Sequence, residues 1–187
     1  EGTKPVELPD DPNATLDEIR RCTGLTVHNN RVWGYGDPEN PQLIYYSQTN
    51  RYDYFDSEDL FLTMARDDNE VPVIVEPMWG GLLIGKRTGW WLLEGDPATS
   101  ISIKSIVRGQ GPMHRAFEVI DGELWYLAED GVRVLTQTDW GIFATQHVSY
   151  EHTPLLHNAD FSNAVFGYYD GRLVIFYKLS SESPHND

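Results

Sequence analysis

The residues in this sequence best suited to metal chemistry are three histidines and a short run of oxygen-bearing side chains. His147, His152 and His157 recur every five residues, a spacing that fits neither one face of a strand nor the i, i+4 pair on a helix. The run Asp67-Asp68-Asn69-Glu70 offers oxygen ligands but lacks the Asp-x-Asp-x-Asp-Gly loop of a calcium site. The sequence therefore predicts no metal site and no cofactor.

Three aspartates that each precede a glycine, Asp121, Asp130 and Asp170, are the candidates for acid–base chemistry. A pair of carboxylates about 5–10 Å apart could hydrolyse a glycosidic bond. Asp-Gly dipeptides also supply the positive φ angles of tight turns, and turn formation is the interpretation we favour. The sequence contains no Gly-x-Ser-x-Gly elbow for a nucleophilic serine. We expect that the chain is not an enzyme and that it has no catalytic residues.

Paired aromatic residues are the candidates for ligand stacking. Trp90 and Trp91 could stack on sugar rings, and Tyr45-Tyr46 is a similar pair. Adjacent side chains of a strand face opposite sides of a sheet, so one member of each pair should be buried. Trp90 and Trp91 are therefore a candidate stacking surface on which only one ring is available.

Acidic residues dominate the charge of the chain, which is −15 at neutral pH. Eight carboxylates and one basic residue, Arg66, lie between Asp53 and Glu76. This excess argues against binding through DNA or RNA phosphates and against docking on an anionic membrane. A solvated loop is the simple interpretation of the cluster, and the alternative is a channel or partner surface formed by Asp67, Asp68 and Glu70. No apolar run is long enough for a membrane-spanning helix.

Short turns divide the chain into repeated strand pairs. The turns are Asn29-Asn30, Gly80-Gly81, Asp121-Gly122 and Asp170-Gly171, and their second residues are 51, 41 and 49 residues apart. Further turns at 86–89 and 129–131 extend the middle repeats into meanders. Gly109-Gln110-Gly111-Pro112 lacks the helix and the Lys-Ser/Thr pair of a phosphate loop, so we expect a turn between repeats there.

These repeats predict an all-β, β-propeller-like fold of antiparallel meanders, because periods of about 40–50 residues are typical of four-stranded propeller blades. An irregular β-sandwich stays open as the alternative. We expect an acidic N-terminal arm or connector over 1–24 with a short helix at 14–21, the propeller-like domain over 25–179, and a polar tail over 180–187. The unfinished last repeat indicates a fragment of a larger propeller.

Two groups of motifs between Leu25 and Val148 occur together in one family. The first group is Val27-His28-Asn29-Asn30-Arg31-Val32-Trp33-Gly34, Asp37-Pro38-Glu39-Asn40-Pro41, Leu43-Ile44-Tyr45-Tyr46-Ser47 and Tyr52-Asp53-Tyr54-Phe55-Asp56. The second group is Trp79-Gly80-Gly81-Leu82-Leu83-Ile84-Gly85-Lys86, Gly89-Trp90-Trp91-Leu92-Leu93-Glu94-Gly95, Gly111, and Asp121-Gly122-Glu123-Leu124-Trp125-Tyr126-Leu127-Ala128-Glu129-Asp130-Gly131-Val132. Together they resemble the propeller-bearing tail nozzle or tail-accessory (stabilisation) proteins of short-tailed bacteriophages.

The resemblance implies a structural virion protein of the phage tail or neck. Such a protein forms part of a homo-oligomeric ring below the portal, contacts other tail or portal-adaptor proteins, and lets DNA pass without specific binding. The resemblance carries over no catalytic residues, and it implies a virion location for a chain that is soluble when isolated.

Two other functions fit the same fold. The tryptophans and tyrosines suit a carbohydrate-binding or glycoside-hydrolysing propeller. The carboxylates suit a protein-interaction propeller whose acidic face meets basic partners.

Overall fold

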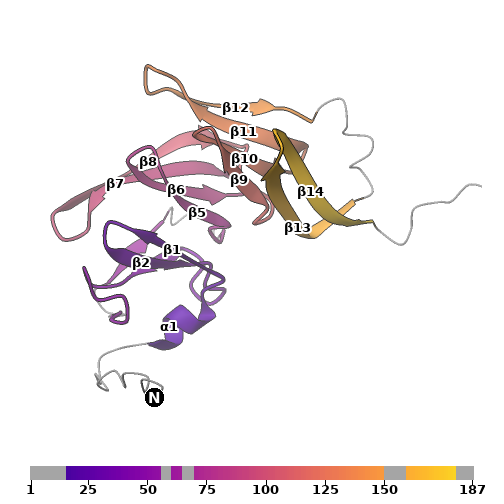
Figure 1. Cartoon of the computed structure of the whole chain (residues 1–187). Helices are drawn as coiled ribbons and strands as arrows, with labels where there is room; N and C mark the ends of the chain where they lie inside the picture. Colours follow the sequence, from indigo (N-terminus) through magenta and orange to yellow (C-terminus); the bar gives the residue numbers. More distant parts are fainter. Residues whose placement is uncertain (1–15, 56–59, 65–69, 150–158, 180–187) are drawn as a thin grey trace, which may run out of the picture. The chain divides into compact units, whose positions relative to one another are not determined.

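The computed structural model describes residues 16–55, 60–64, 70–149 and 159–179, and antiparallel sheets make up most of this part of the chain (Figure 1). Its one helix within these residues is α1 (Leu16–Arg21), which lies in the expected arm. The prediction of an all-β class is confirmed. The chain divides into two compact units, residues 1–69 and 70–187, a boundary that lies inside the domain expected over 25–179.

The first unit contains one four-stranded meander, in which neighbouring strands follow the chain. Its strands are β1 (Gly24–His28), β2 (Arg31–Tyr35), β3 (Leu43–Tyr46) and β4 (Phe61–Thr63). Trp33 and Tyr46 pair across β2 and β3 with ring centroids 5.2 Å apart, and both side chains are buried. On the opposite face, the Tyr45 hydroxyl donates to the buried Asp37 carboxylate over 2.9 Å. Alternating aromatic residues thus stabilise both faces of this sheet.

The second unit contains two further meanders of four strands and one hairpin, each again in chain order. The strands are β5 (Ile74–Met78), β6 (Gly81–Lys86), β7 (Gly89–Asp96) and β8 (Ser100–Arg108); β9 (Phe117–Ile120), β10 (Glu123–Ala128), β11 (Gly131–Gln137) and β12 (Phe143–His147); and β13 (Ala159–Tyr169) with β14 (Arg172–Leu179). The segment at 109–112 lies in the connection from β8 to β9, between two repeats as expected, but it is irregular rather than a tight turn.

The expected turns form the first corner of each repeat. At 29–30, 121–122 and 170–171 both central residues have φ between 48° and 81°, which is the left-handed conformation of a two-residue hairpin turn. The second turns, at 87–88 and 129–130, join β6 to β7 and β10 to β11. Asparagine and aspartate tolerate this conformation because their short polar side chains bond to nearby backbone groups.

The prediction at Gly80-Gly81 is wrong by one residue. The turn residues are Trp79 (φ 51°) and Gly80 (φ 75°), and Gly81 begins β6 opposite Met78. Gly81 is required inside the strand, because a Cβ there would lie 2.5 Å from the Leu93 carbonyl oxygen. A left-handed conformation is costly for tryptophan. The Trp79 ring packs edge-on against Phe143 at 5.2 Å, and this contact offsets part of the strain.

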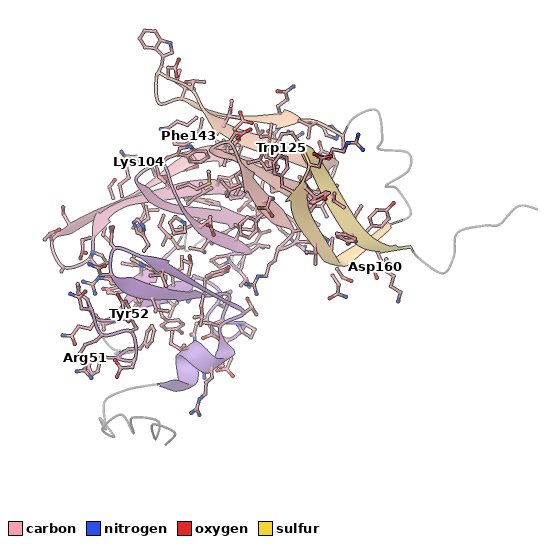
Figure 2. The ribbon with its side chains drawn as sticks, in the orientation of Figure 1. Arg51, Tyr52, Lys104, Trp125, Phe143 and Asp160 are labelled. Carbon is pink, nitrogen blue, oxygen red and sulfur yellow. The ribbon has the colours of Figure 1, made fainter. Side chains whose placement is uncertain are left out.

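Within the second unit, consecutive sheets pack face to face. A buried cluster joins β5–β8 to β9–β12, and its members are Ile74, Met78, Leu83, Trp90, Leu124, Tyr126, Ala128 and Leu135. On the other face of β9–β12, buried Leu127, Val132 and Phe166 lie in a second cluster that reaches the β13–β14 hairpin. Figure 2 shows Trp125 of β10 beside this hairpin, in agreement with its place in that cluster.

Corresponding strands of neighbouring sheets lie against each other. β8 and β12, the fourth strands of their meanders, are in contact, and so are β9 and β13, the first strands of theirs. The sheets are therefore stacked in the same orientation. Complete burial of a large apolar side chain contributes about 1.5–3 kcal/mol, and this stacking buries such residues from two sheets at once.

Candidate functional site

A cleft of about 550 Å³ opens in the second unit where three connecting segments meet. Its lining is drawn from Glu70, the β6–β7 turn, the β8–β9 connection, the β10–β11 turn and β11, and the residues are Glu70, Arg87, Thr88, Gly109, Gln110, Gly111, Met113, Ala128, Glu129, Asp130 and Arg133. In a four-stranded meander the second turn and the exit of the fourth strand lie at the same end of the sheet. Stacking two such sheets in one orientation therefore brings these segments together.

The backbone of Gln110 is held between the two sheets. Its carbonyl oxygen accepts the indole N–H of Trp90 over 3.1 Å and the hydroxyl of Tyr126 over 2.7 Å. The two rings meet edge to face with centroids 4.8 Å apart, and burial raises the pKa of Tyr126. One carbonyl thus satisfies the polar atoms of two buried aromatic side chains, one from each sheet.

Gly111 fixes the other side of this connection. A Cβ on Gly111 would lie 1.7 Å from the carbonyl oxygen of Lys86, so only glycine fits between β6 and the connection. The Gly109 N–H donates to the Thr88 carbonyl oxygen over 2.7 Å. The wall of the cleft formed by 109–111 is therefore fastened to the end of β6 and to the β6–β7 turn.

An ion pair forms the opposite wall. The Arg133 guanidinium holds both carboxylate oxygens of Asp130, at 2.8 Å from Nε and 2.5 Å from Nη2. The hydrogen bond from Arg133 lowers the pKa of Asp130, and the same bond raises the pKa of Arg133. A carboxylate held ionised in this way is a weak base at neutral pH. The pair is suited to binding polar groups rather than to moving protons.

Asp130, His147 and Ser149 are arranged like a hydrolytic triad, with the imidazole between the carboxylate and the hydroxyl. The His147 Nε2 is 3.2 Å from the Ser149 hydroxyl, and its Nδ1 is 3.7 Å from Asp130. The second distance is too long for a hydrogen bond. The Ser149 hydroxyl is buried and accepts the N–H of Val132 over 2.9 Å, so no substrate reaches it. This geometry is that of a clamp between β11 and the end of β12.

The first unit contains a similar clamp, in which a serine hydroxyl again accepts a valine N–H. The Ser47 hydroxyl accepts the N–H of Val32 over 3.0 Å, while the Ser47 N–H donates to the Val32 carbonyl oxygen over 2.8 Å. Two sheets therefore use a buried serine for one structural purpose. The sequence did not reveal these clamps, because no fixed spacing marks them. The serine lies 15 residues from its valine in one clamp and 17 in the other.

The acidic candidates fall partly outside the described residues. Asp67 and Asp68 lie there. Glu70 lines the cleft, and its carboxylate accepts the N–H of Thr88 over 3.0 Å. Glu70 is half-buried, Glu129 and Asp130 at the β10–β11 turn are exposed carboxylates, and Arg87 adds an exposed cation. The cleft thus has mixed charge.

The aromatic candidates differ in exposure. Trp90 is fully buried by the stacking of the two sheets, so no face of its ring can stack on a ligand. Trp91 points to the other face of β7 and is half-buried, with the Lys86 ammonium 5.7 Å from its ring centroid. Of the pair, only Trp91 has an exposed part.

The candidate metal ligands are not brought together among the described residues. His147 contacts Ser149 as above, while His152 and His157 lie outside the described ranges. Within those ranges, no three side chains of histidine, cysteine, aspartate or glutamate form a group able to hold a metal ion. The helical part of the described chain offers nothing long and apolar enough to cross a membrane.

Comparison of the chain with protein-family models and with curated proteins gives no match.

Proposed function

We propose that this chain is a structural component whose stacked sheets are blades of a β-propeller, and that it forms part of the ring-shaped genome-delivery channel of a phage tail or neck. The observation that supports this best is the stacking of β5–β8, β9–β12 and β13–β14 in chain order, in which the fourth strand β8 contacts the fourth strand β12 and the first strand β9 contacts the first strand β13. Radial repetition of four-stranded meanders is how propellers cover both faces of each sheet. The resemblance to tail nozzle and tail-accessory proteins supplies the location.

The side chains of the cleft agree with an architectural role. Asp130 of the cleft is bound by Arg133, and outside the cleft lining the buried Ser149 hydroxyl accepts the N–H of Val132. The overall charge of −15 suits a conduit for DNA, because an acidic wall repels phosphates and gains nothing from counterion release. DNA would pass without being held.

Cryo-electron microscopy of the purified chain tests this role. The proposal predicts closed rings, in which each subunit shows sheets arranged radially. Retention of a labelled DNA duplex at low salt is the second measurement, and none is expected. Single particles without rings at every protein concentration, or tight DNA retention, would contradict the proposal.

A second candidate is a protein-interaction role, which exposed aromatic side chains favour. Trp140 is 89% exposed at the β11–β12 turn, and Tyr169 is 79% exposed at the end of β13. Tryptophan and tyrosine are enriched among the residues that dominate binding energy at interfaces. A pull-down from an infected or native lysate, repeated with Trp140→Ser, would separate specific partners from background.

A further inference from the structure

The turn between β11 and β12 is closed by its own hydrogen bonds. The Gly141 N–H donates to the Thr138 carbonyl oxygen over 2.8 Å, and the Thr138 N–H donates to the Ile142 carbonyl oxygen over 2.9 Å. The Thr138 hydroxyl accepts the N–H of Ile142 over 3.2 Å, and Gly141 has a φ of 71°. This is a hairpin loop over 139–141 whose conformation depends on Thr138 and Gly141.

Trp140 has no part in closing this loop. Its side chain is 89% exposed, and that of Ile142 is 62% exposed. Turns favour glycine, proline, asparagine, aspartate and serine, so the turn itself gives no reason for a tryptophan. An indole ring held on a hydrogen-bonded loop is the kind of side chain that anchors an interface. We call residues 139–142 the tryptophan tip.

The cleft described above lies at the other end of β11. The β10–β11 turn lines the cleft with Glu129 and Asp130, and β11 (Gly131–Gln137) runs from this turn to the tryptophan tip. At about 3.3 Å per residue, β11 separates the two features by roughly 20 Å. Trp140 therefore cannot reach the cleft of its own chain, whereas Trp140 of another copy can.

The cleft has the size and the lining to accept an indole ring. Its volume is about 550 Å³, and clefts of about 300–1,000 Å³ hold organic ligands larger than indole. Met113 and Ala128 contribute apolar surface to the lining. The exposed Glu129 carboxylate is an acceptor for the indole N–H.

The charges of the tip and of the cleft are complementary. Of the two arginines that line the cleft, Arg133 is bound to Asp130, whereas Arg87 is exposed. In the tip, the exposed Asp139 directly precedes Trp140. A guanidinium is attracted both to the face of an indole ring and to a carboxylate, so Arg87 can bind both residues of the tip.

We propose that Trp140 of one copy inserts into the cleft of a second copy, with Asp139 paired to Arg87. The proposal rests on the self-association that the ring-shaped channel requires, and it names the two surfaces that meet. Because these surfaces lie at opposite ends of β11, each copy can offer a tip and receive one. Head-to-tail contacts of this kind close into rings or continue as filaments.

Sedimentation equilibrium of the full chain over a range of concentrations measures this contact. The net charge of −15 opposes self-association, so the buffer contains about 0.15 M salt, which screens charges more than about 8 Å apart. Trp140→Ser should weaken the association about thirtyfold, and Arg87→Glu about tenfold. Asp139→Arg should also weaken it. The double variant Asp139→Arg, Arg87→Glu should associate more tightly than either single variant, because it restores the ion pair with reversed charges.

Two variants of the β13–β14 hairpin are the matched controls. Tyr169→Ser removes another aromatic side chain, which is 79% exposed, and Arg172→Glu reverses another exposed arginine. Neither change should alter the association constant. Circular dichroism confirms that each variant is folded.

Photo-cross-linking locates the contact directly. The variant Trp140→p-benzoylphenylalanine is prepared with ¹⁴N and with ¹⁵N, and the two preparations are mixed and irradiated. Mass spectrometry should then find cross-links of mixed isotope that join position 140 to residues of the cleft lining, such as Met113.

Three outcomes would overturn the proposal. The first is a chain that stays monomeric at every concentration, because the partner of Trp140 would then be a different molecule. The second is association that is equally strong in Trp140→Ser, and the third is cross-linking only outside the cleft. Closed rings that persist in Trp140→Ser would overturn this contact and leave the channel role standing. Open filaments joined through the cross-linked contact would support the contact and contradict the channel role.

Discussion

Replacing Gly111 by alanine should destabilise the second unit strongly, because the new methyl group meets backbone on both sides. Its Cβ would lie 1.7 Å from the Lys86 carbonyl oxygen and 2.8 Å from the Gly89 nitrogen. Neither atom belongs to a flexible side chain, so the β8–β9 connection must move away from β6. Overpacking of this kind costs about 1–3 kcal/mol.

The movement also weakens hydrogen bonds that the connection makes. The Gly111 N–H donates to Arg87 over 3.3 Å, and the Gln110 carbonyl oxygen accepts from both Trp90 and Tyr126. Each bond lost adds about 1 kcal/mol. The total is therefore roughly 3 kcal/mol or more, which corresponds to a fall of about 1–2 M in the urea midpoint.

Urea unfolding followed by tryptophan fluorescence measures this effect, since five of the six tryptophans lie in the second unit. Gly167→Ala is the matched control. Gly167 lies in β13 with no atom within 4 Å of an added Cβ and without a left-handed φ, so this change should alter stability by less than about 1 kcal/mol. Equal midpoints for the two variants would refute the close packing of the connection on β6.

Three further predictions concern the side chains of Ser149, Asp130 and Cys22. Ser149→Ala leaves the Val132 N–H buried without its acceptor and should lower the free energy of unfolding by about 1–3 kcal/mol in a urea titration; an unchanged midpoint would contradict the clamp. Asp130 has a lowered pKa when folded, so its pairing with Arg133 stabilises the protein above the pKa of the unfolded chain and is lost as the pH falls through the lower, folded value. Because Asp130 is nearly half exposed, Asp130→Asn should lower the free energy of unfolding by less than about 1 kcal/mol at pH 7, and the two proteins should be equally stable near pH 2. A difference in the free energy of unfolding that stays constant with pH would count against the pairing. Burial raises the pKa of the Cys22 thiol to about 12. Alkylation of Cys22 by iodoacetamide at pH 8 should therefore be about a hundredfold slower in the folded chain than in the urea-unfolded chain. Equal rates in the two states would show that the folded chain has an accessible thiolate.

The local corners of the fold could be predicted from the sequence, because each depends on residues adjacent in the chain. Asn29-Asn30, Asp121-Gly122 and Asp170-Gly171 formed the expected turns, since the preference for positive φ is a property of the dipeptide itself. The turn at Trp79 could not be placed to the residue. Its position depends on Gly81 fitting against the Leu93 carbonyl oxygen, a contact that exists only once β6 and β7 have paired.

The fourth strands and the site were harder to predict for a related reason. β8 and β12 are outer strands with many exposed polar residues, so their hydrophobic pattern is weak. The cleft depends on the Gln110 carbonyl oxygen. Every residue has such a backbone acceptor, so the residue type at position 110 does not predict this contact. The pairing of Asp130 with Arg133, three residues apart across a turn, could have been noticed as a local ion pair.

The face-to-face stacking of consecutive sheets is the claim on which the remaining conclusions depend. Nuclear Overhauser effects between the rings of Trp90 and Tyr126 test it most directly, because their centroids lie 4.8 Å apart and the two residues belong to different sheets. Selective labelling of tryptophan and tyrosine in the 187-residue chain makes the signals assignable. The stacked arrangement predicts cross-peaks between these two rings. Their absence, with both rings assigned, would show that β5–β8 does not pack on β9–β12.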